Sequence, residues 1–216
     1  MSVTSLVLTY VMQVYGALRE RNALGLQLHL LLGETSDAGE MLARLGPCGQ
    51  FSAGYSHLVA LGGAMGAMKE AHHFYPVLFY FRFRQPYYSI SAQAHLVLDA
   101  VSLIRSTLAD ENASWLKEAA AVEALWRVAR MLVVTLETAF LASDLPEAIP
   151  TSSVERRRWR ADWERSAARL AREGIAVVRD ETAANAYLEL RARWSPHIAR
   201  LALAMAYRPT DIAAHG

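Results

Sequence analysis

The chain has 216 residues, of which 53% are hydrophobic and 20% charged, and its mean hydropathy is +0.13. This composition excludes a disordered chain, and the length suits one domain with a substantial core. The net charge of +1 gives no electrostatic indication of nucleic-acid binding, and the single cysteine, Cys48, excludes an internal disulfide and any CxxC motif.

The chain begins with an apolar segment, because residues 3–18 carry no charge and are followed by Arg19-Glu20-Arg21. A bilayer span needs about 20 apolar residues, and polar residues interrupt this shorter run. No basic residue precedes the run, so it does not resemble a signal peptide. Two interpretations remain: an amphipathic core helix, or the last turns of a transmembrane helix whose remainder lies upstream. In the second case the basic residues would place this end in the cytoplasm.

The rest of the chain shows helical periodicity, with no alternating strand pattern, phosphate-binding loop or internal repeat. The pattern predicts an all-α bundle of roughly seven to nine helices. Up to residue 109 the predicted elements are two helical stretches in 23–46 broken at Gly33, the second capped by Ser36, a turn at 46–49, and helices at 51–73, from Pro76 to before Pro86, and 89–109. Beyond residue 109 they are a helix over about 113–142 capped by Asn112 or Ser114, a linker at 145–150, a helix at 152–173 closed by Gly174, a strand or loop at 175–178, a helix at 180–194, and a last helix from Pro196 to about Tyr207.

Four residues suggest an alternative in which the protein is soluble and binds a metal ion or a small ligand. Glu70 and His73 form an E-x-x-H pattern, and His95 and Asp99 lie four residues apart on another predicted helix. Two E-x-x-H copies build the metal sites of ferritin-like bundles, whereas this chain has one copy. The more ordinary interpretation is a set of hydrogen-bonded polar residues.

Asp99 lies in an otherwise apolar stretch, and a buried carboxylate must be paired. The neighbouring candidates for its partner are His95, Arg82 and Arg84. Cys48 lies in a turn without a recognisable base or oxyanion site, so the sequence predicts no enzyme.

The segment 152–173 interleaves arginine with tryptophan, including the run Arg156-Arg157-Arg158-Trp159-Arg160 followed by Trp163. A solvated charged helix with buried tryptophans is one interpretation. The other is a membrane-surface adaptor that uses this helix together with residues 1–18 on anionic lipid.

Three stretches of the chain together resemble a known bacterial family. They are 8–24, 72–104 and 190–205, and they contain an H-x-x-Y-P-x-L-x-x-F-R pattern, a Leu-Asp-Ala segment and a Leu-Arg-aromatic-Pro stretch. In this order they resemble the region that follows the pore in two-transmembrane proteins of the bacterial potassium-channel family. The matching positions are His72, Tyr75, Pro76, Leu78, Phe81, Arg82, Asp99, Trp194 and Pro196.

The resemblance implies that residues 1–22 are the cytoplasmic end of the pore-lining helix and that 23–216 form a helical cytoplasmic domain at the inner membrane. It implies a regulatory or assembly role, a tetrameric full-length protein, and no cofactor or nucleic-acid partner. The chain contains no pore-loop sequence of the T-V-G-Y-G type. In the full-length protein, potassium would therefore bind only in a pore region that this chain does not contain.

Overall fold

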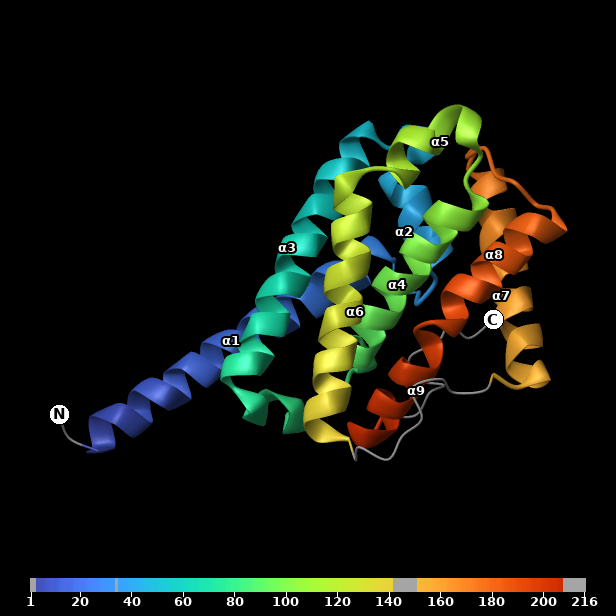
Figure 1. The fold of residues 1–216 in the computed structure, drawn as a ribbon. Helices are drawn as coiled ribbons and strands as arrows, with labels where there is room; N and C mark the ends of the chain where they lie inside the picture. Colours follow the sequence, from blue (N-terminus) through green and yellow to red (C-terminus); the bar gives the residue numbers. More distant parts are fainter. Residues whose placement is uncertain (1–2, 34, 142–150, 208–216) are drawn as a thin grey trace.

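A computed structural model describes residues 3–33, 35–141 and 151–207 (Figure 1). These residues form α-helices α1 to α9 with three short 3₁₀ turns and no strand, which confirms the predicted all-α bundle. Among the described helices, none is both long enough and apolar enough to cross a bilayer.

The first helix, α1 (Val3–Leu31), extends well beyond the bundle at its N-terminal end and packs against it at its C-terminal end (Figure 1). Its second half contacts α3 (Ser52–Phe74), α4 (Ile90–Thr107) and the 3₁₀ turns Pro76–Tyr80 and Pro86–Tyr88. Gly33 follows α1 with a left-handed φ of 59°, so the predicted break at this glycine is confirmed.

The centre of the bundle is α4, all of whose residues are buried except Ala92 and Arg105. On one side α4 contacts α6 (Ala120–Phe140), which packs along α3, and α2 (Ala38–Leu45). On the other side it contacts α8 (Glu181–Ala192) and α9 (Ser195–Ala204), while α7 (Ser153–Arg172) packs on α2 and α8. The long apolar segment 90–104 therefore serves several interfaces at once, which explains its nearly continuous hydrophobicity.

Some predicted helix ends agree with the structure and others are wrong. α7 begins with a capping box between Ser152 and Glu155, and Gly174 follows it with a φ of 74°, both near the predicted ends. The prediction that Ser36 caps α2 is wrong, because the side chain of Asp37 accepts the hydrogen bond from the Gly39 amide. The predicted linker at 145–150 lies outside the described residues.

The predicted single helix over 113–142 is wrong, because the structure has a short α5 (Asp110–Lys117) and a separate α6. Leu116 and Val122 are both fully buried. On one continuous helix, residues six positions apart lie about 120° apart around the axis. The extended backbone at Ala119 changes the chain direction, and both side chains then enter the core.

Of the two predicted alternatives for segment 175–178, a strand or a loop, the structure has a loop. Its backbone makes one isolated bridge to the end of α4, with hydrogen bonds from Ala109 N to Ala176 O at 2.9 Å and from Val178 N to Thr107 O at 2.7 Å. This bridge joins the middle of the chain to its last third.

Candidate functional site: the junction between the projecting helix and the bundle

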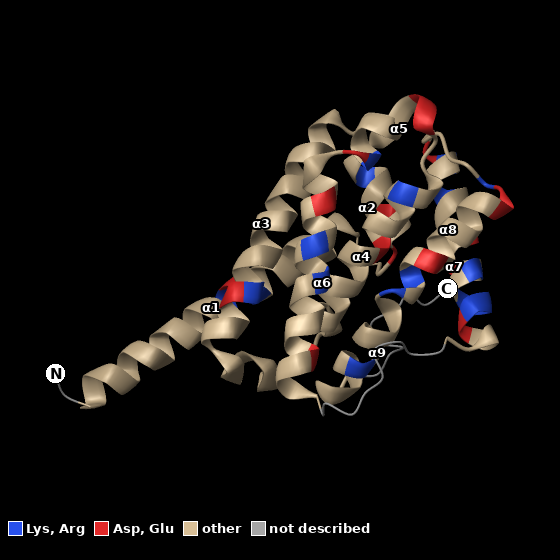
Figure 2. Cartoon of the chain, in the orientation of Figure 1, with Lys and Arg blue, Asp and Glu red and all other residues tan. Residues whose placement is uncertain are grey.

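The projecting part of α1 is apolar over most of its circumference. Residues 3–13 are all exposed and uncharged, with Val3 78% and Leu6 66% exposed, and Figure 2 shows the first charged residues only where α1 reaches the bundle. Because successive residues lie 100° apart on a helix, Leu6, Val7 and Leu8 cover most of its circumference, and Ser5, Thr9 and Gln13, spaced four residues apart, form a polar stripe on the remaining side. Because residues 3–13 are exposed, the interpretation as a core helix is wrong for this part of α1, and large exposed apolar surfaces typically mark interaction sites.

Where α1 meets the bundle, the guanidinium of Arg21 binds two backbone carbonyls. It donates from Nη1 to Leu78 O at 3.0 Å and from Nη2 to Phe81 O at 3.1 Å, and it lies over the Phe83 ring. Burial lowers the pKa of Arg21 to about 10, and among the described residues no carboxylate pairs with it. Two charge-assisted hydrogen bonds therefore hold segment 78–83 on α1.

These contacts explain why the predicted helix from Pro76 to before Pro86 is wrong. Only Pro76–Tyr80 is helical, as a 3₁₀ turn, and residues 81–83 have no regular structure. Proline suits the first turn of a helix, and the sequence contains this favourable signal. However, the carbonyls of Leu78 and Phe81 accept hydrogen bonds from Arg21, which is distant in sequence, and the chain leaves the helical path there.

Apolar and aromatic contacts complete this junction. Leu78 is fully buried and packs with Val14 and Leu18 of α1 in a cluster separate from the main core. Tyr75 donates its hydroxyl hydrogen to Gln13 Oε1 at 3.2 Å, and its ring meets Tyr10 edge-on. Tyr75 and Leu78 of the H-x-x-Y-P-x-L pattern therefore attach α1 to the bundle at Tyr10, Gln13 and Val14.

His72 is also buried beside the junction. Its Nδ1 lies 2.8 Å from Met68 O, and its Nε2 has no partner among the described residues. Burial lowers the pKa of His72 to about 4, so the ring is neutral at pH 7 and donates from Nδ1. A neutral ring is also what the nearby Arg21 charge favours.

The end of the described chain returns to the same junction. The Tyr207 hydroxyl accepts a hydrogen bond from Phe83 N at 3.0 Å and donates to Phe83 O at 3.1 Å. The guanidinium of Arg82, otherwise exposed, lies over the Tyr207 ring. His72, Tyr75, Leu78, Phe81 and Arg82 therefore all belong to the junction or to its immediate support, and Pro76 begins the turn between them.

The remaining motif positions belong to a second, fully internal cluster between α4 and α8. Asp99 accepts a hydrogen bond from the Tyr187 hydroxyl, which in turn accepts one from Arg191. Arg191 lies 3.5 Å from Asp99 and 3.0 Å from Asp162. The predicted partners of Asp99 are wrong, since Arg82 and Arg84 are on the surface and the structure records no hydrogen bond from His95 to this carboxylate.

Aromatic rings enclose this internal cluster. Trp194, 1% exposed, meets the His95 ring edge-on and donates from Nε1 to Ser102 Oγ at 3.2 Å, and Pro196 lies in the first turn of α9 directly after it. Burial lowers the pKa of His95 to about 3 and raises that of Tyr187 well above its ordinary value. The cluster is a paired, desolvated element of the core, as the structural interpretation of Asp99 predicts.

The structure does not assemble the metal-binding alternative. Glu70 is exposed and pairs with Lys69, His73 is also exposed, and His95 and Asp99 are buried within the bundle. Throughout the described ranges, no group of three or more His, Cys, Asp or Glu side chains could hold a metal ion.

The Arg/Trp helix α7 directs its tryptophans inward. Trp159 and Trp163 are buried, and Arg156 and Arg160 form ion pairs with Glu189 and Glu181 of α8. This arrangement agrees with a solvated charged helix that covers the core.

Comparisons of the chain with protein-family models, with curated proteins and with solved structures found no match. The family resemblance thus stays a prediction. Its motif positions nevertheless fall into two structural groups, the α1 junction and the internal cluster. Sequence reasoning did not identify Arg21 or Tyr187 as site residues, and it marked Arg191 only as the arginine of the Leu-Arg-aromatic-Pro stretch, without a partner. Arg21 binds carbonyls at least 57 residues away and Tyr187 binds Asp99 on another helix, and the local signal for Arg21 was its position at the end of the apolar run.

Proposed function

We propose that this chain is the regulatory or assembly domain of a potassium-channel-like membrane protein, on the cytoplasmic side of the inner membrane. In this proposal α1 continues the pore-lining helix, and the bundle performs no turnover chemistry. The observation that supports it best is the exposed, mainly apolar projection of α1, which is attached to the bundle by the motif residues at 72–82.

The exposed apolar side chains of residues 3–13 require a partner surface or lipid. Burial of apolar area stabilises a complex by about 25 cal/mol per Å², and most of the side chains exposed on this part of α1 are apolar. A pore-lining helix leaving the bilayer has this character, with apolar contacts on one segment and charges where it enters the cytoplasm. Arg19, Glu20 and Arg21 occupy that position in the chain.

The junction also supports a regulatory role, because it can transmit movement in both directions. Channels of this class open by displacement of the inner helix. A shift of α1 moves Arg21 and, with it, the carbonyls of Leu78 and Phe81, and a rearrangement of the bundle acts on α1 by the same contacts. Such coupling biases opening according to the difference in free energy between the conformations of the bundle.

The test uses two fusions behind the pore region of a two-transmembrane potassium channel, one ending at residue 22 and one containing the whole chain. In liposomes, the whole-chain fusion should differ in tetramer yield or, by about fivefold or more, in open probability. Arg21→Ala should shift the whole-chain fusion toward the short one, whereas Arg19→Ala, at an exposed arginine, should not. Equal tetramer yield and equal open probability of the two fusions would contradict the proposal.

A further inference from the structure

Large apolar side chains that remain exposed are concentrated at one end of the molecule. Twelve of the twenty that the described residues expose lie either in residues 3–15 of α1 or in residues 74–81. The second group belongs to the aromatic segment, defined as residues 72–89, which contains eight aromatic residues, two arginines and no Asp or Glu. Phe74 is 68% exposed and Tyr80 73%, so the junction with α1 leaves these rings largely in contact with solvent.

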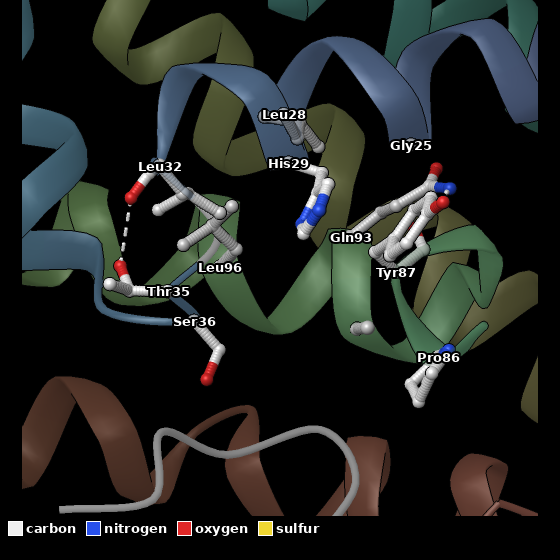
Figure 3. Close-up of a pocket in the computed structure, with 11 residues that line it drawn as sticks. Gly25, Leu28, His29, Leu32, Thr35, Ser36, Pro86, Tyr87, Gln93 and Leu96 are labelled. Carbon is white, nitrogen blue, oxygen red and sulfur yellow. Dashed lines mark hydrogen bonds between the residues drawn. The ribbon is translucent and has the colours of Figure 1, made fainter.

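The aromatic segment runs alongside α1, starting where the helix projects from the bundle (Figure 1). Three contacts define this alignment, and they join Tyr75 to Tyr10, Phe81 to Arg21, and Tyr87 to His29. Figure 3 shows the third of them, where the Tyr87 and His29 rings stack with their centroids 4.2 Å apart beside a small pocket. Both stretches of chain run in the same direction, so the first residues of the aromatic segment lie nearest to the projecting end of α1.

Along this direction the exposed side chains of both stretches change in the same order. In α1, the mainly apolar residues 3–12 are followed by the exposed Tyr15 and then by Arg19. In the aromatic segment, exposed apolar and aromatic side chains at 74–81 are followed by two exposed arginines. A phospholipid bilayer selects the same order from its inside to its outside, because tyrosine is enriched at its interface and arginine extends to the charged headgroups.

The dimensions of the junction agree with those of the headgroup layer. Leu78 packs against Val14 and Leu18, which lie about 6 and 12 Å from Tyr10 along the axis of α1. The headgroup layer is about 5–8 Å thick on each side of a bilayer. A bilayer whose acyl boundary reaches the level of Tyr10 and Tyr75 therefore places the residues around Leu78 at the level of the headgroups.

We propose that the aromatic segment is a membrane-contact surface, which lies in the phospholipid headgroup layer of the bilayer that α1 enters. Phe74 and Val77 pack at the boundary with the acyl chains, and Tyr80 lies among the headgroups. Arg82 and Arg84, both exposed, donate hydrogen bonds to lipid phosphates.

This inference rests on the proposed function, because it requires that residues 3–13 of α1 lie in a bilayer. The aromatic segment exposes four large apolar side chains against eight in residues 3–15, so it adds to the membrane binding of α1 and does not replace it. As a second point of attachment it restricts the tilt of α1 relative to the bilayer. The position of the bundle against the membrane is thereby coupled to the projecting helix.

Fluorescence quenching in phosphatidylcholine vesicles measures the depth of single positions of the whole chain. The single cysteine is first removed by Cys48→Ser, and Val7→Cys, Phe74→Cys or Leu30→Cys is then added to carry an environment-sensitive fluorophore. Vesicles that contain a lipid with a nitroxide near its headgroup should quench the labels at positions 7 and 74. The label at position 30, which is exposed on the part of α1 beyond the junction, should be unaffected.

A pair of matched variants measures the contribution of the surface to binding. Phe74→Gln should weaken the binding of the whole chain to these vesicles about tenfold, because one large apolar side chain no longer leaves water. Leu30→Gln removes an apolar side chain that is 65% exposed outside the surface, and it should bind as the unmodified chain does. Both positions are exposed, so both variants should fold.

Quenching at position 7 without quenching at position 74 would overturn this inference and leave the proposed function intact. Quenching at neither position would show that α1 does not enter the bilayer, and it would contradict both. Equal quenching at positions 74 and 30, or unchanged binding of Phe74→Gln, would also overturn the inference. Self-association of the chain without vesicles that Phe74→Gln abolishes would overturn it as well, because the surface would then belong to a contact with a second copy.

Discussion

At the scale of single residues, the buried charges of the internal cluster are neutralised by partners distant in sequence. Arg191 contacts both Asp99 and Asp162, and the Tyr187 hydroxyl joins Arg191 to Asp99. Desolvation of each charge is offset only while these contacts persist. The internal cluster should therefore be far more sensitive to substitution than the ion pairs on the surface.

Asp99→Ala tests this contrast. It leaves the buried Tyr187 hydroxyl without its acceptor and Arg191 with Asp162 as its remaining carboxylate, and we expect a loss of about 1–3 kcal/mol in the free energy of unfolding. The measurement is urea denaturation followed by circular dichroism. Glu181→Ala, which removes an exposed pair with Arg160, is the control and should leave the midpoint nearly unchanged. Similar midpoints for the two variants would show that the cluster does not stabilise the fold.

The two buried histidines predict a pH dependence of stability. The pKa values of about 4 for His72 and about 3 for His95 are below the ordinary value of 6.5. At a pH between 6.5 and these lowered pKa values, the unfolded chain therefore binds more protons than the folded one. The free energy of unfolding should thus fall as the pH is lowered below about 6.5, by up to about 1.4 kcal/mol per pH unit for each histidine.

Urea denaturation at pH 7, 6 and 5 measures this slope. His72→Gln removes one titrating group and should make the slope shallower, whereas His57→Gln, at an exposed histidine, should keep it. A slope that is the same in all three proteins would refute the assignment to His72.

At the scale of secondary-structure elements, the packing of α1 depends on one close approach. The backbone of α1 at Gly25 lies against the turn Pro86–Tyr88 and against Gln93, with no room for a Cβ. A larger residue must displace backbone atoms there.

Gly25→Ala should therefore destabilise the protein by about 1–3 kcal/mol, although alanine is the better helix former. Gly63→Ala in α3 provides the matched control, because a Cβ there would meet no atom within 4 Å. This control should stabilise the protein by about 0.5–1 kcal/mol. Thermal unfolding of the two variants side by side measures the difference, and a stabilised Gly25→Ala would contradict the described contact.

The helical pattern of the sequence predicted the long helices of the bundle, such as α3, α4 and α7. It failed where a tertiary contact determines the backbone. The segment after Pro76 has local signals for a helix, but Arg21, 57 residues before Leu78, binds the carbonyl there. Similarly, the hydrogen-bond partner of Asp99 lies 88 residues further along the chain, beyond the reach of local pattern. The motif positions were found by resemblance, but their division into a junction and an internal cluster required the fold.

At the scale of the whole molecule, the apolar projection of α1 contributes little to the stability of the bundle. Residues 3–9 are all exposed, whereas the first α1 side chain that packs in the junction cluster is Val14. Deletion of residues 3–9 should change the free energy of unfolding by less than about 1 kcal/mol, because it removes no buried side chain.

The same deletion should abolish flotation of the chain with liposomes of neutral phosphatidylcholine. Leu203→Gln removes a large exposed apolar side chain of α9 and is the control that should still float. Flotation that requires anionic lipid and survives the deletion would instead favour the membrane-surface adaptor and α7.

The central position of α4 also has a consequence for the synthesis of the protein on the ribosome. Its covering helices α8 and α9 are the last described elements of the chain, and the bridge between Leu108 and Val177 cannot form before residue 177 has emerged. The ribosome adds about 5–20 residues per second, so α8 and α9 emerge on the order of ten seconds after α4. The apolar surface of α4 that they cover stays exposed until then. During that interval the nascent chain exposes two apolar surfaces that can bind other chains: the uncovered part of α4 and the start of α1. Efficient production in cells should therefore depend on chaperones or on early delivery of the N-terminal segment to its destination.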